Sequence, residues 1–167
     1  VLSFILSALA WLGWARTLNR AAIGVPVGAF GLHCFALIAR MYISGRPPVT
    51  NLYSSAVFIG WGCVALGLLM NLFYRNGVGT VIAAICGFLT LGVADFLGAD
   101  GDTFVVLQAV LDTQFWLATH VTCITFGYAT TYVGGLLGIM YVIRGVCTTS
   151  LTREAGRADQ RLAGRAA

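Results

Sequence analysis

The stretch LYSSAVFIGWGCVALGLLMNLFY, residues 52–74, carries no charged side chain from one end to the other. An α-helix rises about 1.5 Å per residue, so roughly 20 apolar residues are needed to cross the hydrocarbon core of a bilayer. This stretch is long enough, and its surface offers little that water can solvate. It predicts a transmembrane helix.

Similar apolar runs lie on both sides of residues 52–74, separated by short polar breaks. These further runs are residues 1–15, 21–43, 78–97 and 115–143. We therefore predict an all-α protein, a polytopic transmembrane helix bundle of about five spans. Residues 1–145 form the bundle and residues 146–167 a polar cytoplasmic tail, with a short interfacial helix at 103–111. Because the first run starts at Val1, we expect the chain to begin within a longer protein.

The composition argues against a soluble domain and against nucleic acid as a partner. Hydrophobic residues make up 59% of the chain and charged residues 10%. Soluble domains carry roughly 25% charged residues, so water is not the solvent for most of this surface. The net charge is +4, but the arginines are scattered and form no basic face with interleaved aromatic residues. The expected surrounding is the lipid bilayer.

The arginines also predict an orientation. They stand in alternate breaks between the runs, as Arg16, Arg20, Arg75 and Arg144. Basic residues favour the cytoplasmic side of a membrane. We therefore place the loop 45–51 and the aspartate-containing break after residue 97 on the outer side.

Two histidines lie inside the predicted spans, where ionisable groups are costly and are functional candidates. His33 is near the middle of its run, and His120 is five residues into the last run. Either one can instead be a packing residue, bonded to a neighbouring helix or wetted at the interface. Their predicted depths differ by roughly 9 Å, so two histidines that bound metal would serve different sites.

Other residues in or near the spans have both a chemical and an ordinary interpretation. Arg40 and Arg46 can hold carboxylates in bidentate pairs or extend to lipid headgroups. The five cysteines show no CxxC pairing and are expected to be small, mostly buried hydrophobes. Glycines at 24, 28, 127, 134 and 138 are expected to let helices approach closely.

Two segments resemble a known family. They are GRPPVTNLYSS at residues 45–55 and FWLATHV at residues 115–121, which continues to YAT at 128–130. They resemble the "RxPxxNLYES" and "WLxxHV…YA" motifs of the CcsA/ResC-type cytochrome c assembly family. The chain departs from the family at Ser54, where glutamate is usual, and it lacks the family's tryptophan-rich segment and second external histidine. It resembles the first half of a longer protein.

The resemblance implies a function. The protein would bind haem b as transported substrate, move it across a bacterial inner (plasma) membrane and present it on the outer side to apocytochrome c. It would act with a partner membrane subunit as a component of a haem–cytochrome c ligation (synthase) complex, and this part alone would be inactive. His120 is carried over as an axial iron ligand of an external haem, and His33 as a ligand in a membrane site. Arg40 and Arg46 would bind the haem propionates.

Two other classes of protein remain open from the residues alone. A small-molecule or ion transporter would show paired broken helices at the membrane midplane, to which only Pro26 points. A structural membrane subunit would use its histidines only for packing. Neither class predicts a Soret band in the purified protein.

The predicted orientation can be tested by cysteine labelling in intact cells. Cysteines introduced at Thr50 and Asp102 should react with a membrane-impermeant reagent added from outside, because both lie in breaks assigned to the outer side. A cysteine at Asn76 should not react until the membrane is opened. Labelling of Asn76 from outside would overturn the orientation.

Overall fold

The computed structural model describes Ile5 and residues 15–74, 77–99, 101, 103–104 and 113–147. These residues form four long α-helices and no strand: α2 Ala15–Ser44, α3 Leu52–Tyr74, α4 Val78–Gly98 and α5 Gln114–Cys147. Each is long and apolar enough to cross a membrane. The all-α, multi-pass class is confirmed. Most of the predicted span 1–15, of the interfacial helix 103–111 and of the tail after Cys147 lies outside the described residues; Thr103 and Phe104 form a turn.

Helix α2 begins earlier than the polar break predicted. It includes Arg16 and Arg20, and it continues through Pro26, although only Ile23–Ser44 is apolar enough to span a membrane. Arginine is a good helix former, so a polar break marks where the membrane ends and not where the helix ends. Helix α5 likewise passes Arg144 before it stops.

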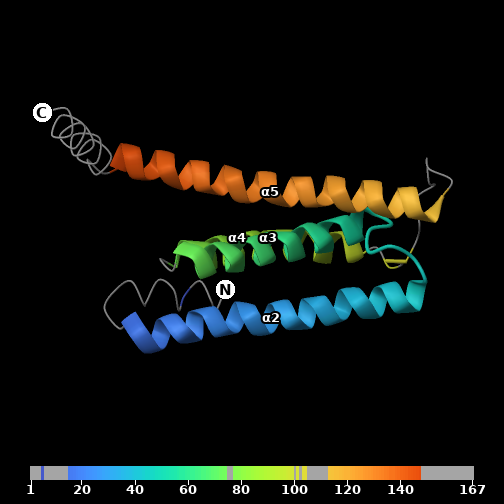
Figure 1. Ribbon diagram of the computed structural model, residues 1–167, viewed down its shortest axis with the longest axis horizontal. Coiled ribbons are helices and arrows are strands. Elements are labelled where there is room, and N and C mark those ends of the chain that lie inside the picture. Colours follow the sequence, from blue (N-terminus) through green and yellow to red (C-terminus); the bar gives the residue numbers. More distant parts are fainter. Residues whose placement is uncertain are drawn as a thin grey trace, which may run out of the picture. The chain divides into compact units, whose positions relative to one another are not determined.

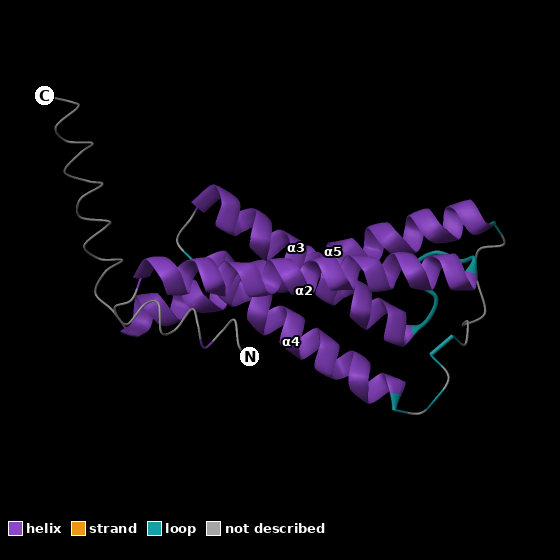
Figure 2. Cartoon of the chain, turned by 90° about the horizontal axis from the view of Figure 1, so that it is seen from below, coloured by secondary structure: helices purple, strands orange, loops and turns teal. Residues whose placement is uncertain are grey.

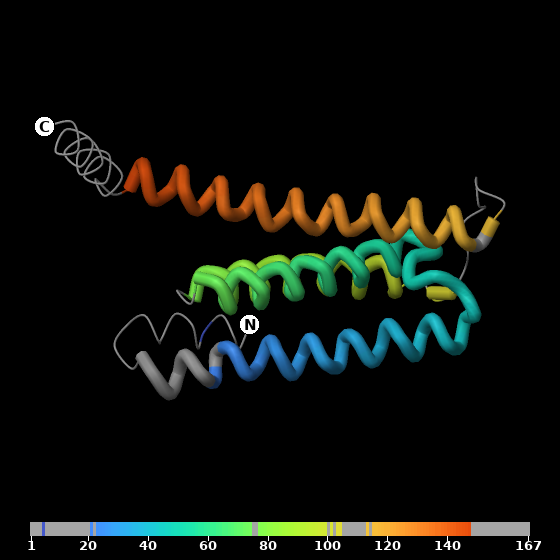
Figure 3. Tube along the Cα trace, in the orientation of Figure 1, coloured from blue at the N-terminus to red at the C-terminus, as the bar shows by residue number. Residues whose placement is uncertain are grey.

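The chain divides into two compact units, residues 1–133 and 134–167, with the boundary inside α5. In the first unit α2, α3, α4 and the start of α5 run in alternating directions (Figures 1 and 3). The loop 45–51 and the start of α5 therefore lie at one end of this unit, which we call the loop 45–51 end. In the second unit the described residues are the final turns of α5 and are mostly exposed.

Glycines make the two tight connections possible. Gly45, with φ of 61°, follows α2 and donates its N–H to the carbonyl of Met41 at 2.9 Å. Gly77, with φ of 77°, is the N-cap residue of α4. A side chain is strained at such positive φ values, whereas glycine adopts them freely. Gly45 therefore lets the chain leave α2 sharply, and Gly77 lets α4 begin soon after α3 ends.

Helices α3 and α4 make the closest contact in the structure. A Cβ atom added at Gly67 would lie 2.7 Å from the carbonyl oxygen of Gly79 and 2.8 Å from the Cβ of Ala83. One added at Gly87 would lie 3.0 Å from Val64. The absent side chains thus let the two backbones meet, which is how helices associate in lipid.

Helix α2 packs less closely. Figure 2 shows α4 running obliquely to α2, so the two helices separate toward the C-terminal end of α4. Contact with the other helices is made through a small apolar core of Leu37, Val49 and Phe58. Space is therefore left between α2 and α4.

The glycines that pack are different from those the spacing indicated. A Cβ added at Gly24, Gly28, Gly127, Gly134 or Gly138 would meet nothing within 4 Å. For Gly24, Gly28 and Gly127, which lie in the first unit, the prediction was wrong for contacts among the described residues, because four-residue spacing does not tell which face of a helix meets a neighbour. The five cysteines are free, and Cys63 and Cys86 are buried, as small hydrophobes would be.

The α3–α4 contact predicts opposite effects for two glycine substitutions. Gly67→Ala should lower the stability of the purified protein by about 1–3 kcal/mol, because the new methyl group overlaps the backbone of α4. Gly92→Ala, on α4 with nothing within 4 Å, should be neutral or stabilising. Thermal unfolding in detergent measures both. Equal midpoints for the two variants would contradict the close packing.

Candidate functional site

His33 occupies the middle of α2 and is half-buried. Its ring donates a hydrogen bond to the backbone carbonyl of Val57 on α3. Its Nε2 atom is shielded from solvent and has no hydrogen-bond partner. Within the described residues, only one other buried side-chain polar atom shares that condition, the hydroxyl of Thr80. Buried polar groups are nearly always paired, so this Nε2 atom requires an explanation.

The imidazole of His33 lies beside Gly60 of the facing helix. A Cβ added at Gly60 would lie 2.5 Å from the hydroxyl of Thr90 and 3.9 Å from Cε1 of His33. The hydroxyl of Thr90 donates at 2.7 Å to the carbonyl of Cys86 in its own helix and is therefore satisfied there. The missing side chain at Gly60 thus admits Thr90, and the imidazole lies within ordinary contact distance of the same position.

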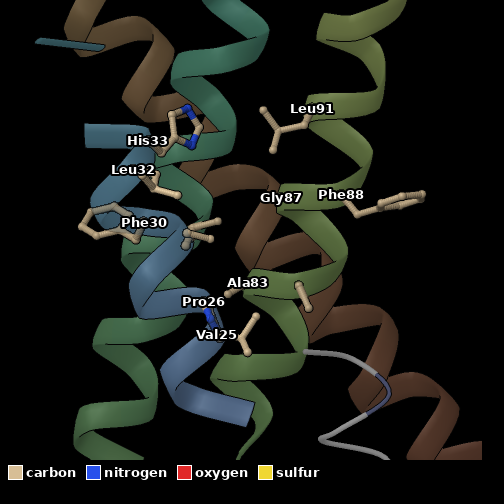
Figure 4. A pocket seen from close by; sticks show the side chains of 12 residues that line it. Val25, Pro26, Phe30, Leu32, His33, Ala83, Gly87, Phe88 and Leu91 are labelled. Atoms are coloured by element: carbon tan, nitrogen blue, oxygen red, sulfur yellow. The ribbon is translucent and has the colours of Figure 1, made fainter. Parts of the chain in front are cut away.

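A cavity of about 540 Å³ opens between α2 and α4 beside this imidazole (Figure 4). His33 supplies the only titratable side chain of its lining. The other lining residues are Val25, Pro26, Ala29, Phe30, Leu32, Val64, Ala83, Ala84, Gly87, Phe88 and Leu91. Its size falls within the range of about 300–1,000 Å³ typical of ligand sites. An apolar ligand that accepts one nitrogen lone pair would suit it.

Aromatic side chains support the wall of this cavity. Trp61 on α3 stacks on Phe30 with ring centroids 5.8 Å apart, and it packs against Phe58 at 5.3 Å. Its indole N–H donates to the sulfur of Cys34 at 3.1 Å. Trp61 therefore holds α2 against α3 at the level of His33. Trp61 was not among the candidate residues predicted from the sequence, although the aromatic pair at 58 and 61 was a visible signal.

His120 lies near the start of α5, and its side chain is exposed. The next residue, Val121, packs against the core formed by Leu37, Val49 and Phe58. That contact fixes the first turns of α5 at the loop 45–51 end while the imidazole stays accessible. Trp116, one turn earlier, is also exposed and meets Phe115 edge-on at 5.4 Å.

The two histidines lie at different levels of the helix layer. Val121 packs against the core of Leu37, Val49 and Phe58. Within that core, Leu37 is four residues, or about 6 Å, closer to the loop 45–51 end than His33. The imidazole of His33 instead bonds at Val57 and faces Gly60. This arrangement is compatible with separate sites. Within the described residues no three His, Cys, Asp or Glu side chains gather as a metal cluster, so a metal held here would depend on single imidazoles.

The two candidate arginines differ in their surroundings. The guanidinium of Arg40 donates to the backbone carbonyl of Thr103 and lies over the rings of Tyr53 and Phe104, at 5.3 and 4.5 Å. Arg46 is exposed in the loop 45–51. A second cavity, of about 450 Å³, lies nearby and is lined by Tyr53, Val57, Leu91, Ala94, Asp95, Gly98, Ala99 and Thr103.

The motif segment forms a capping box at the start of α3. The hydroxyl of Ser54 accepts from the backbone N–H groups of Thr50 and Asn51, at 2.8 and 2.9 Å. The side-chain oxygen of Asn51 accepts from the N–H of Ser54 at 2.8 Å. In such boxes the residue three after the cap is commonly glutamate or glutamine. Serine takes that role here and is almost fully buried.

Four membrane-length helices define the class of this chain as a multi-pass helical membrane protein. Residues 49–160 match the family described as cytochrome C assembly protein, and the chain belongs to that family. His120 falls inside the match, whereas His33, Arg40 and Arg46 precede it. The resemblance of the two sequence motifs is confirmed.

Curated relatives named cytochrome c biogenesis protein CcsA are about one-third identical to the chain over the residues that align. That of Synechococcus sp. (strain WH7803) is 30% identical over 140 residues, covering 82% of this chain and 44% of the relative. That of Synechococcus sp. (strain JA-3-3Ab) is 36% identical over 129 residues, covering 77% and 37%. That of Chlamydomonas reinhardtii is 31% identical over 134 residues, covering 75% and 37%.

The chain thus spans less than half the length of these relatives. No solved structure is significantly similar to it.

The capping box predicts a cost for one hydroxyl. Ser54→Ala should lower stability by about 0.5–2 kcal/mol, because two backbone N–H groups lose their acceptor. The matched control is Ser55→Ala, since the Ser55 hydroxyl only donates to the carbonyl of Asn51. Thermal unfolding of both variants gives the comparison, and a larger loss for Ser55→Ala would refute the assignment.

Proposed function

We propose that this chain is the part of a cytochrome c assembly protein that binds haem b in the membrane and presents it for covalent attachment to apocytochrome c. Family membership assigns the chain to cytochrome c assembly. Haem is the cargo in this proposal. The observation that carries it is the unpartnered Nε2 of His33 beside an apolar cavity.

The surroundings of His33 suit an iron ligand. A metal-binding histidine usually donates its second ring N–H to a carbonyl or carboxylate, which fixes the ring and its tautomer. The bond to the Val57 carbonyl supplies that partner and leaves Nε2 as an acceptor. Haem iron takes such nitrogen atoms as axial ligands, and the largely apolar macrocycle matches the lining residues.

His120 suits the later step of the proposed function, in which haem is presented to apocytochrome c outside the membrane. Its imidazole is accessible at the loop 45–51 end, next to a residue anchored in the core. In the proposal this end faces the periplasmic side of a bacterial inner membrane, where the haem meets apocytochrome c. A partner membrane subunit, together with the remaining length found in the relatives, would complete the ligation site.

The arginines are the proposed source of positive charge for the haem propionates. Arg46 is exposed and can form bidentate pairs with carboxylates. Arg40 is partly engaged already, with its guanidinium bonded to Thr103. The transporter alternative predicted broken helices, whereas α2 continues through Pro26.

Substitution of the two histidines tests the proposal in the intact protein. His120→Ala should abolish cytochrome c maturation, because alanine offers iron no lone pair. His33→Ala should lower the haem content in the membrane without preventing helix insertion. The measurements are the Soret absorbance of each purified variant and the yield of holocytochrome c.

Imidazole in the medium should partly rescue His120→Ala and should rescue His33→Ala less, since the cavity is within the bilayer. Thr119→Ala is the matched control, because its exposed hydroxyl donates only to its own helix, at 2.9 Å. Normal haem content and maturation in His120→Ala would refute that ligand assignment.

A further inference from the structure

The backbone carbonyl of Thr103 joins three segments of the chain. It accepts from the guanidinium of Arg40 on α2 and from Nδ2 of Asn51, the N-cap residue of α3, at 2.8 Å. Thr103 itself belongs to the turn that follows α4. One oxygen atom therefore ties the turn to the ends of two other helices.

The guanidinium of Arg40 is also fixed by aromatic rings. It lies 5.3 Å from the ring centroid of Tyr53 and 4.5 Å from that of Phe104. Tyr53 can approach the end of α4 because a Cβ added at Gly98 would lie only 3.2 Å from its ring. A guanidinium over the face of an aromatic ring is attracted by the ring's quadrupole. These contacts hold the guanidinium of Arg40 in one place. One of the two rings, that of Phe104, belongs to the same turn as the Thr103 carbonyl to which Arg40 donates.

The tied turn leads into the helix that carries His120. Helix α5 begins at Gln114, ten positions after Phe104. Near its start, Val121 packs against the apolar core formed by Leu37, Val49 and Phe58. The tied turn thus precedes the start of α5 in the sequence, and a packed residue follows it.

We propose that Arg40 is a positioning residue that, together with Asn51, fixes the turn after α4 through the Thr103 carbonyl and so sets the place of His120. This role rests on the proposed function of His120 and differs from a direct contact between Arg40 and a haem propionate. A propionate clamp needs Arg40 alone. A tie at Thr103 needs Asn51 as well.

Paired substitutions separate the two roles. Arg40→Gln removes the charge and the planar guanidinium. Asn51→Ser keeps a good N-cap residue but is too short to reach Thr103. Tyr53→Phe is the control, because it preserves the aromatic face below the guanidinium. Circular dichroism checks that each variant is folded, and Arg40→Lys, which keeps charge and donors without the planar group, is used if Arg40→Gln does not fold.

The first measurement is hydrogen–deuterium exchange of the detergent-purified protein, which does not depend on haem. Arg40→Gln and Asn51→Ser should each accelerate exchange in residues 113–121 by about 5- to 30-fold, as when one or two contacts to a segment are lost. The double variant should show little more than the larger single effect, because both donors act on one oxygen. Tyr53→Phe should match the unmodified protein.

The second measurement is the Soret absorbance that His120→Ala removes. Both single variants should lower it and broaden the band, since His120 is present but displaced. If Arg40→Gln removes this absorbance while Asn51→Ser leaves both it and the exchange rates unchanged, Arg40 contacts the ligand directly and the positioning role is wrong. Faster exchange in a protein whose Soret band does not depend on His120 would support the tie and refute the haem assignment instead.

Discussion

Gly67 and Gly79 allow the backbones of α3 and α4 to touch, and the other parts of the first unit are placed against this pair. In lipid the hydrophobic effect gives little drive for helix association, because acyl chains are as apolar as leucine. Close van der Waals contact must supply the energy, and a single methylene group at the contact removes it. Once α3 and α4 are joined, Gly60 and Thr90 define the surface that His33 faces.

The looser contact of α2 has a chemical consequence. Helix α2 is held to α3 by Trp61, which stacks on Phe30 and bonds to Cys34, while the space toward α4 stays open. A neutral imidazole can be buried in an apolar layer only if its hydrogen-bonding groups find partners. His33 finds one at Val57, and its Nε2 atom stays buried without a hydrogen-bond partner.

The motif at residues 45–55 has a structural role that could not be predicted from its sequence. Asn51 caps α3 through its side-chain oxygen and reaches Thr103 through its side-chain nitrogen. Asn51 thus caps the start of α3 and also holds the turn that follows α4. Ser54 completes this cap, because its hydroxyl accepts from the backbone N–H groups of both Thr50 and Asn51.

The sequence by itself determined the class of the protein and which histidines are the candidate iron-binding residues. Apolar runs of membrane length predicted α3 and α4 almost to the residue, because a bilayer imposes a minimum length on every span. His33 and His120 stood out as candidate functional residues, because ionisable groups are costly in lipid. The motif at the start of α3 indicated the family.

Only the tertiary structure decided which residues meet. Gly60, Gly67 and Gly79 make the close contacts, and Gly24 and Gly28 do not, because spacing along a helix leaves its rotation about the axis undetermined. Trp61 and Thr103 gained their roles in the same way, from partners on other segments. The engagement of Arg40 depends on a backbone carbonyl 63 positions further along the chain. The periodicity of a sequence indicates to which helix a residue belongs. It does not indicate which residue of another helix lies beside it, because that depends on how the separate helices pack.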